Sequence, residues 1–283
     1  MEHNLEVKIL GTRGSLAAPY ADRMQFGGNS SCVSVRWNEG LAVFDCGTGL
    51  HALGQEFLAE QGILKEIHIF LSHVHLDHIC ALPFFPLLFR KDWKIHIYGC
   101  PMEGETFCET IGRVIRPPFW PITLNQTAAE IVWHDLKQDM MLKLPGEVLV
   151  KTFKANHGPG ALLYRLERGN GSVVYGLDHE MTEETNDAYC RFIAGTDLLI
   201  FDGMYTEEEY VHCKGFGHSV WNWGIDLIKR CKIGNVCISH HNWNRSDAVL
   251  CEMESQAKEK NSRCIFAREG AIFHLSGNNG ECL

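Results

Sequence analysis

Four side chains that can bind a metal stand within six residues of one another: His73, His75, Asp77 and His78. The apolar residues at 67–71 predict a buried strand that ends where these side chains begin. Alternate residues of an extended segment point to the same side, so His73 and His75 can face one ion. Asp77 and His78 follow the turn and can reach a second ion. A carboxylate beside three imidazoles suits zinc, manganese or iron. The pattern predicts a metal site; the alternative is a histidine-rich loop that only closes a strand.

The elements that must position this site alternate between strands and helices along the whole chain. Strands are predicted at residues 5–10, 32–37, 41–44, 67–71, 95–98, 148–153, 161–166, 172–175, 198–201 and 236–239, with two short ones near 265 and 272. Helices are predicted at 49–61, 104–115 and 220–231, and from about 82, 182 and 246. This alternation indicates an α/β fold. With no repeat or linker in the sequence, we predict a single domain, residues 1–283, with two similar halves of about 1–150 and 151–283.

Three loop positions after other predicted strands also carry metal-capable side chains: His157, Asp178 and His240. Loops at strand ends are where scaffolds of this class present ligands. His157 taken alone is an isolated loop histidine, and His241 is an alternative to its neighbour His240. Asp45 also ends a predicted strand, and we interpret it as an anchor for a ligand rather than a ligand.

The spacing His-x-His-x-Asp-His after an apolar strand resembles the metallo-β-lactamase superfamily. The sequences at 11–15 (Gly-Thr-Arg-Gly-Ser), 27–32 (Gly-Gly-Asn-Ser-Ser-Cys) and 44–49 (Phe-Asp-Cys-Gly-Thr-Gly) are similar to blocks of its phosphodiesterase branch. That branch includes ribonuclease Z and cyclic-nucleotide phosphodiesterases. The resemblance covers nearly the whole chain. It implies a four-layer αββα sandwich, in which two sheets pack face to face, helices lie outside and two metals lie at one edge.

The same resemblance implies how the ligands divide between two divalent ions, of which zinc is the first candidate and manganese or iron the alternatives. One ion would be held by His73, His75 and His157, the other by Asp77, His78 and His240, and Asp178 would bridge both. The implied reaction is attack on a phosphodiester by a hydroxide that bridges the two metals.

Asp77 and His218 are the predicted catalytic residues. The segment 205–210 followed by Gly217-His218-Ser219 resembles the ribonuclease Z block that carries the general acid. Histidine suits that task because its unperturbed pKa of about 6.5 lets it hold and release a proton near neutrality. The alternative is that His218 caps a helix that starts near Ser219.

Five more residues are candidates for substrate contact. Arg116, Phe119 and Trp120 belong to a proline-rich segment that cannot continue a helix, so the arginine could bind phosphate and the rings could stack on a base. The alternative is a rigid loop whose aromatic rings pack on the core. Arg13 and His179 could bind a phosphate oxygen. Alternatively, Arg13 ties down a turn and His179 bonds to a neighbouring carboxylate.

Composition limits the partners and the compartment. The net charge of −9 and pI of about 5.9 favour a small anionic substrate over a long nucleic acid, which usually needs a basic face. The longest apolar stretch, residues 82–89, contains two prolines and is too short to span a bilayer. The first residues show no secretory signal. The twelve cysteines are scattered without a Cys-x-x-Cys pair, which favours reduced thiols and a cytoplasmic protein.

The leading hypothesis is a phosphodiesterase that acts on a small cyclic nucleotide or related cyclic phosphodiester. One alternative is tRNA 3′ processing, although ribonuclease Z carries a Gly/Pro-rich arm and no insertion of that composition occurs here. Another is a non-catalytic nucleotide-binding protein. A β-lactam hydrolase is disfavoured, because such enzymes are usually exported. The resemblance also implies a homodimer, for which the segments 82–89 and 116–121 offer apolar surface.

Overall fold

Two large mixed β-sheets form the centre of the molecule. The computed structural model describes residues 5–59, 64–276 and 281–282. The first sheet has the order β17-β16-β1-β3-β4-β5-β6-β7 and the second the order β15-β13-β12-β11-β10-β9-β8. The first comprises β1 (Leu5–Gly11), β3 (Cys32–Trp37), β4 (Gly40–Phe44), β5 (Glu66–Phe70), β6 (Lys94–Gly99), β7 (Glu130–Asp135), β16 (Ile272–Leu275) and β17 (Glu281–Cys282). The second comprises β8 (Met141–Leu144), β9 (Val148–Lys154), β10 (Leu162–Arg168), β11 (Gly171–Gly176), β12 (Leu198–Asp202), β13 (Asn235–Ser239) and β15 (Cys264–Phe266). A short ladder pairs β2 (Arg13–Gly14) with β14 (His241–Asn242).

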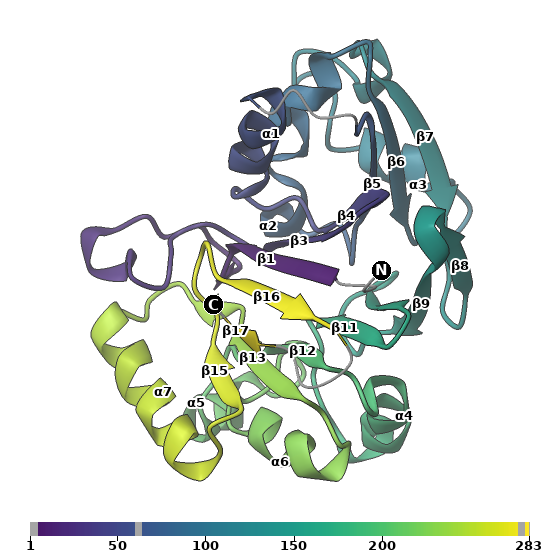
Figure 1. Ribbon diagram of the computed structural model, residues 1–283. Helices are drawn as coiled ribbons and strands as arrows, with labels where there is room; N and C mark the ends of the chain where they lie inside the picture. The colour runs from purple at the N-terminus through teal and green to yellow at the C-terminus, as the bar shows by residue number, and fades with distance from the viewer. Residues whose placement is uncertain (1–4, 60–63, 277–280, 283) are drawn as a thin grey trace.

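Three buried apolar layers show how the elements stack. The layer between the sheets includes Val7 and Val35 from the first and Val150 and Leu166 from the second. A second layer packs α1 (Leu50–Ala59) and α3 (Phe107–Gly112) on the first sheet. A third packs α4 (Glu183–Ile193), α6 (Trp223–Arg230) and α7 (Asp247–Lys260) on the second. Figure 1 shows these helices on the outer faces, so the predicted αββα sandwich is confirmed.

Several elements differ from the sequence expectation for local reasons. The helix expected from residue 82 is two 3₁₀ turns, Leu82–Phe84 and Pro86–Phe89, because each proline lacks a backbone donor. β7 and β8 were not predicted; they are half-exposed and lack the apolar run of a central strand. The prediction also missed α5 (Glu207–Cys213), although Thr206 and Glu209 form a capping box at its start. The two-halves interpretation stays a prediction; β16, near the end of the chain, pairs with β1.

The carboxyl ends of the parallel strands meet at one edge of the sandwich. β11, β12 and β13 run parallel in register, with Gly176 beside Phe201 and Asp202 beside Ser239. In the first sheet, Phe44 of β4 lies beside Phe70 of β5. The residues that follow these strands therefore share one edge, which is where the predicted ligands stand.

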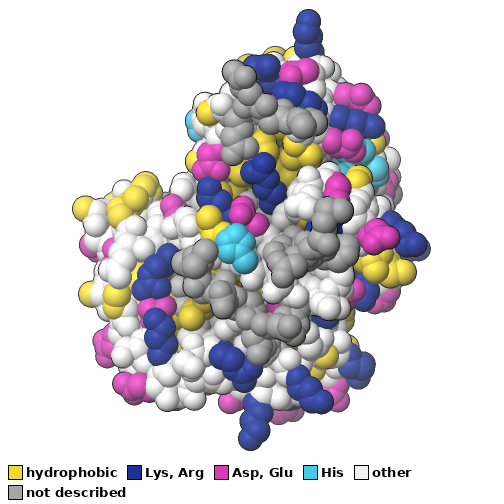
Figure 2. All heavy atoms as spheres, viewed as in Figure 1, with side chains coloured by type: hydrophobic (Ala, Val, Ile, Leu, Met, Phe, Trp, Pro, Cys, Tyr) yellow, Lys and Arg dark blue, Asp and Glu magenta, His cyan; other side chains and the backbone are white. Residues whose placement is uncertain are grey.

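Charged side chains of both signs are spread over the molecule. On the described part of the face in Figure 2, Lys and Arg side chains lie among Asp and Glu side chains. Among the described residues, no helix has the length and apolar character needed to cross a membrane.

Candidate metal centre

The first group of predicted ligands lies where the loop after β5 meets the loop after β9. His73, His75, His157 and Asp178 each place one donor atom within 4.8 Å of all the others. The Nδ1 atom of His75 is 3.1 Å from Nε2 of His157. Oδ2 of Asp178 is 3.6 Å from Nε2 of His73 and 3.5 Å from Nε2 of His157. This spacing is suited to one metal ion bound between the four side chains.

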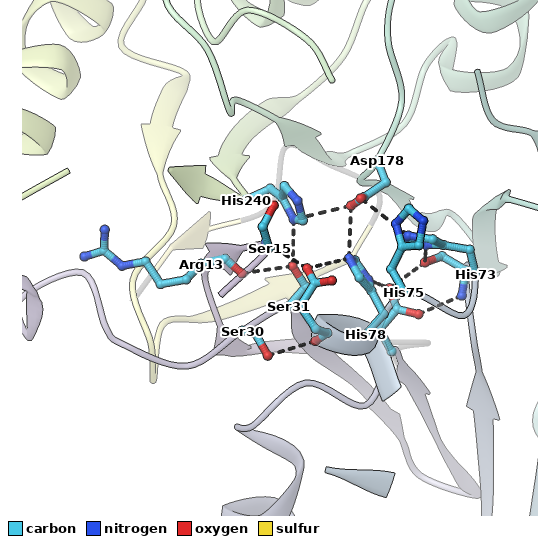
Figure 3. Close-up of polar contacts among 12 residues, drawn as sticks. Arg13, Ser15, Ser30, Ser31, His73, His75, His78, Asp178 and His240 are labelled. Atoms are coloured by element: carbon cyan, nitrogen blue, oxygen red, sulfur yellow. Dashed lines mark hydrogen bonds and ion pairs between the residues drawn. The ribbon is translucent and has the colours of Figure 1, made fainter. Parts of the chain in front are cut away.

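The second group lies on the other side of Asp178. Asp77 and His78 come from α2 (Leu76–Ile79), and His240 follows β13. Nε2 of His78 is 3.1 Å from Oδ2 of Asp77 and 3.2 Å from Oδ1 of Asp178. Nδ1 of His240 is 3.3 Å from the same Oδ1. The two oxygens of Asp178 thus face different groups, as Figure 3 shows, and this arrangement suits a carboxylate that bridges two ions.

The donor atoms fit a metal because the protein leaves them unsatisfied. Nε2 of His73, His78 and His240 and Oδ1 of Asp178 are buried and make no hydrogen bond to any described residue. An unpaired buried polar atom is costly. Imidazole and carboxylate donors in these numbers suit divalent zinc, manganese or iron.

The pKa values of the ligand side chains also suit a bound cation. Burial lowers the pKa of His73, His75 and His240, so these rings remain neutral as ligands must be. Burial acts the same way on His78, but the carboxylates of Asp178, Asp45 and Asp77 outweigh it and raise the pKa of His78. The carboxylates therefore stabilise a positive charge at His78, where a divalent ion can replace the proton.

Neighbouring side chains fix the orientation of the ligands. Nδ1–H of His78 donates to Oδ2 of Asp45 at 2.6 Å, so Nε2 faces the cluster. Ser72 and Tyr175 hold that carboxylate through hydroxyl bonds of 2.7 Å each, and Oγ of Ser31 lies 2.8 Å from Nδ1 of His240. Such partners set the tautomer and direction of metal-binding histidines. Asp45 has the geometry of the anchor proposed for it.

Sharp turns present three of these residues at the sheet edge. Asp45, Asp178 and His240 have φ values of 61°, 56° and 56°. Non-glycine residues adopt this left-handed conformation at a cost of order 1 kcal/mol or more. All three directly or almost directly follow the strands β4, β11 and β13, so the turn redirects the side chain into the cluster.

His218 belongs to neither of these two groups, although one of its ring nitrogens lies within 4.8 Å of donor atoms of Asp178 and His240. Its Nδ1 is 2.8 Å from Oδ2 of Asp202 and 3.9 Å from Oδ2 of Asp178. Burial alone would lower the pKa of His218, but the Asp202 carboxylate outweighs it and raises this pKa to about 9. The helix α6 begins at Trp223 with Asn222 as its cap, so the capping alternative for His218 is wrong. Asp202 was missed, although it ends a strand just as the other acidic residues do.

Two candidate substrate contacts point elsewhere, and these predictions are wrong. Arg13 is fully buried, and its guanidinium donates to the carbonyls of Gly27 and Arg245 at 2.7 and 2.8 Å. Figure 3 shows it extending away from the ligands. His179 is also buried, and its Nδ1 accepts the N–H of Asn156 at 2.9 Å. Burial lowers the pKa of His179 to about 4. Arg13 ties down a turn, and His179 is a neutral residue of the scaffold.

The three candidate residues of the proline-rich loop differ in exposure and in contacts. Trp120 packs edge-on against Phe84 at 4.6 Å between ring centroids and contacts the apolar layer under the first sheet. Phe119 is 76% exposed and Arg116 is exposed. No contact recorded among the described residues joins these three side chains to the ligands, so a substrate role for them stays a prediction.

The rings of His240 and His241 point in different directions, and this separates the two candidates for the last ligand. Nε2 of His241 lies 3.0 Å from the carbonyl oxygen of Ala267, and its ring stacks on Phe266. Burial lowers the pKa of His241 to about 3. His241 therefore faces the core, and His240 faces Asp178.

Comparison with known proteins places the chain in a family. Residues 42–241 match the model of the beta-lactamase superfamily domain. Ribonuclease Z from Methanosarcina acetivorans is 35% identical, over 87% of this chain and 90% of that protein. Ribonuclease Z from Treponema denticola is 29% identical, over 94% of this chain and 96% of that protein.

Solved structures share the fold over nearly the whole chain. The metallo-beta-lactamase fold protein YhfI from Bacillus subtilis has a TM-score of 0.71 at 19% identity, over 96% of this chain and 99% of that one. A diphosphatase of the PhnP family has the same TM-score at 17% identity, over 100% of both chains. The chain belongs to the beta-lactamase superfamily and, within it, to the ribonuclease Z-like branch of metal-dependent hydrolases.

Proposed function

We propose that this chain is a binuclear metal-dependent phosphodiesterase that hydrolyses a small cyclic nucleotide or a related cyclic phosphodiester. The observation that carries the proposal is the pair of donor groups that share Asp178, with His218 beside them. Seven donors of suitable chemistry and one protonated histidine supply the parts that two-metal hydrolysis needs.

Each residue has a defined task in this proposal. The two donor groups would hold the ions, and bound ions would supply an activated water and positive charge for the phosphoryl oxygens. Burial alone would raise the pKa of Asp77, but His78 outweighs burial and holds it below its ordinary value, so Asp77 stays ionised as a ligand. His218, whose pKa the Asp202 carboxylate raises, would donate a proton to the leaving oxygen. Asp202 fixes the His218 ring through Nδ1.

A cavity of about 930 Å³ adjoins the centre and supports a small substrate. His75 and His157 of the metal centre line it, and so do Glu183 and Glu184, which are exposed. The two carboxylates outnumber the one exposed cation of the lining, Lys214, so the cavity favours a substrate with few charges beyond the phosphodiester at the metals. The net charge of −9 acts in the same direction.

The second candidate is 3′ processing of a tRNA precursor. The 35% identity to an archaeal ribonuclease Z over most of both chains favours it. Both candidates use the same centre and differ in what lies beyond the scissile phosphate.

A substrate screen separates the candidates. The protein, reconstituted with zinc or manganese, is given cyclic mononucleotides, cyclic dinucleotides and a tRNA precursor at matched concentration, with Asp178→Ala as the inactive control. We expect turnover of a cyclic phosphodiester that Asp178→Ala lacks. Cleavage of the precursor alone would establish the second candidate, and tight nucleotide binding without turnover by the wild type would identify a binding protein.

A further inference from the structure

Glu180 is a buried carboxylate close to the centre that no role above explains. It is 3% exposed and lies two residues after Asp178. Its Oε1 accepts the hydroxyl of Tyr210 at 2.7 Å and the N–H of Gly215 at 2.9 Å. Its Oε2 accepts the N–H groups of Gly215 and Gly217, each at 3.0 Å. Burying a carboxylate costs several kcal/mol unless it is well bonded, and these three donors supply that bonding.

The backbone of Glu180 connects the same point to a third segment. Its N–H donates to the carbonyl of Asn156 at 3.0 Å, and Nδ2 of Asn156 donates to its carbonyl at 2.9 Å. Asn156 directly precedes His157. Glu180 thus joins three loops, and each carries a residue of the centre: Asp178, His157 and His218.

The position of Gly217 explains why this connection matters for the centre. Nδ1–H of His157 donates to the carbonyl of Gly217 at 2.9 Å, which leaves Nε2 of His157 facing Asp178. Gly217 has φ of +86°, and a Cβ atom there would lie 2.1 Å from Nδ1 of His157, so this segment fits closely against the ring. The next residue is His218. A shift of Gly217 would therefore move one ligand and the proton donor together.

We propose that Glu180 is a positioning residue of the metal centre, one whose carboxylate holds residues 215–217 so that Gly217 orients His157 and presents His218. This inference deepens the proposed function and rests on the same centre. It distinguishes the two ions: the one held by His73, His75 and His157 depends on Glu180, whereas the one held by Asp77, His78 and His240 does not.

The test compares Glu180→Gln with Asp187→Asn, which makes the same chemical change on an exposed side chain of α4 that pairs with Arg230. The amide of Glu180→Gln removes the charge and one acceptor oxygen, and in either orientation its NH2 group faces the N–H of Gly215, which contacts both carboxylate oxygens. Metal affinity is measured by chelator competition with zinc, and amide exchange is followed for residues 213–219. We expect the affinity for one ion to fall roughly 10- to 100-fold, the usual effect of losing an outer partner of a ligand, with faster exchange at Gly215 and Gly217. The control should match the wild type.

Two further measurements keep the result decisive. With bis(p-nitrophenyl) phosphate, Glu180→Gln should lose kcat on the order of 10- to 100-fold with little change in KM, as for a misplaced catalytic constellation. Tyr210→Phe removes a single donor to Glu180 and should shift affinity and exchange in the same direction by less. Equal weakening of both ions in step with a lower Tm, or unchanged affinity and exchange in both variants, would overturn the inference. A wild type that hydrolyses no phosphodiester would refute the proposed function. Metal affinity and amide exchange would still test the positioning role of Glu180.

Discussion

Asp202→Asn is the perturbation that tests most sharply how the protein prepares its proton donor. Oδ2 of Asp202 lies 2.8 Å from Nδ1 of His218, and both side chains are buried. The amide keeps the shape of the side chain but removes the charge that favours the imidazolium. His218 then loses the main group that raises its pKa, whereas burial, which lowers it, remains.

The magnitude follows from the two pKa values. Asp202 is the largest contribution that raises the pKa of His218 from the ordinary 6.5 to about 9. This difference of about 2.5 corresponds to about 3 kcal/mol. Loss of the whole difference would place the basic limb of the variant about 2.5 pH units below that of the wild type, and between the two limbs its turnover would fall about tenfold per pH unit. At pH values below both limbs the two proteins should approach each other.

The sign of the pH dependence follows from the role of His218 as an acid. Activity that needs protonated His218 is present below its folded-state pKa and is lost as the pH rises through it. Bound cations lower this pKa in both proteins alike, so the predicted quantity is the distance between their basic limbs. The assay is kcat against pH on the cyclic nucleotide that the screen identifies, with metal content checked and Asp187→Asn as the control. A basic limb at the same pH in Asp202→Asn and wild type would refute the reasoning.

Four other predictions concern the proton donor His218, the bridging carboxylate of Asp178, the buried His68 and the oligomeric state. His218→Ala should keep both metals and lose turnover roughly 10²- to 10⁴-fold on a cyclic nucleotide, with a smaller loss on a nitrophenyl ester, whose leaving group hardly needs a proton; equal losses would exclude the general-acid role. Asp178→Ala should lower the occupancy of both ions in elemental analysis, because its two oxygens face different groups, and loss of one ion alone would speak against bridging. Burial and the neighbouring His96 lower the pKa of His68 to about 4. As the pH drops from 6.5 to 4, His68 is therefore protonated in the unfolded chain but not in the folded one, and the free energy of unfolding falls. Denaturant titrations at both pH values should show the wild type losing up to about 3 kcal/mol that His68→Gln keeps. Light scattering at micromolar concentration should give the mass of a homodimer, and a fully active monomer would contradict it.

The ligands could be predicted because they follow a simple rule of sheet geometry. Apolar runs identified the strands, and parallel strands in register bring the residues after them to one edge. His73, Asp178 and His240 each stand at such a position. The αββα arrangement followed from the resemblance, since alternation alone indicates only an α/β fold.

What the sequence could not predict is the direction of individual side chains. Neighbouring residues at a turn point to different sides, so Asp178 faces the metals while His179 faces the scaffold. His240 and His241 divide in the same way. Arg13 stands on the short strand β2 beside the centre, yet its guanidinium points away from the ligands and satisfies backbone carbonyls. The side chain of Asp202 contacts a residue 16 positions away, and that of Glu180 contacts residues 30 to 37 positions away. No local sequence pattern shows which distant residue such a side chain will contact.

The most direct test of the central claim is the rate of bis(p-nitrophenyl) phosphate hydrolysis as metal is returned to the metal-free protein. The two donor groups around Asp178 predict that activity rises until two equivalents of zinc or manganese per chain are bound and then levels off. Full activity at one equivalent or without metal, or no hydrolysis at two bound equivalents, would contradict a binuclear phosphodiesterase.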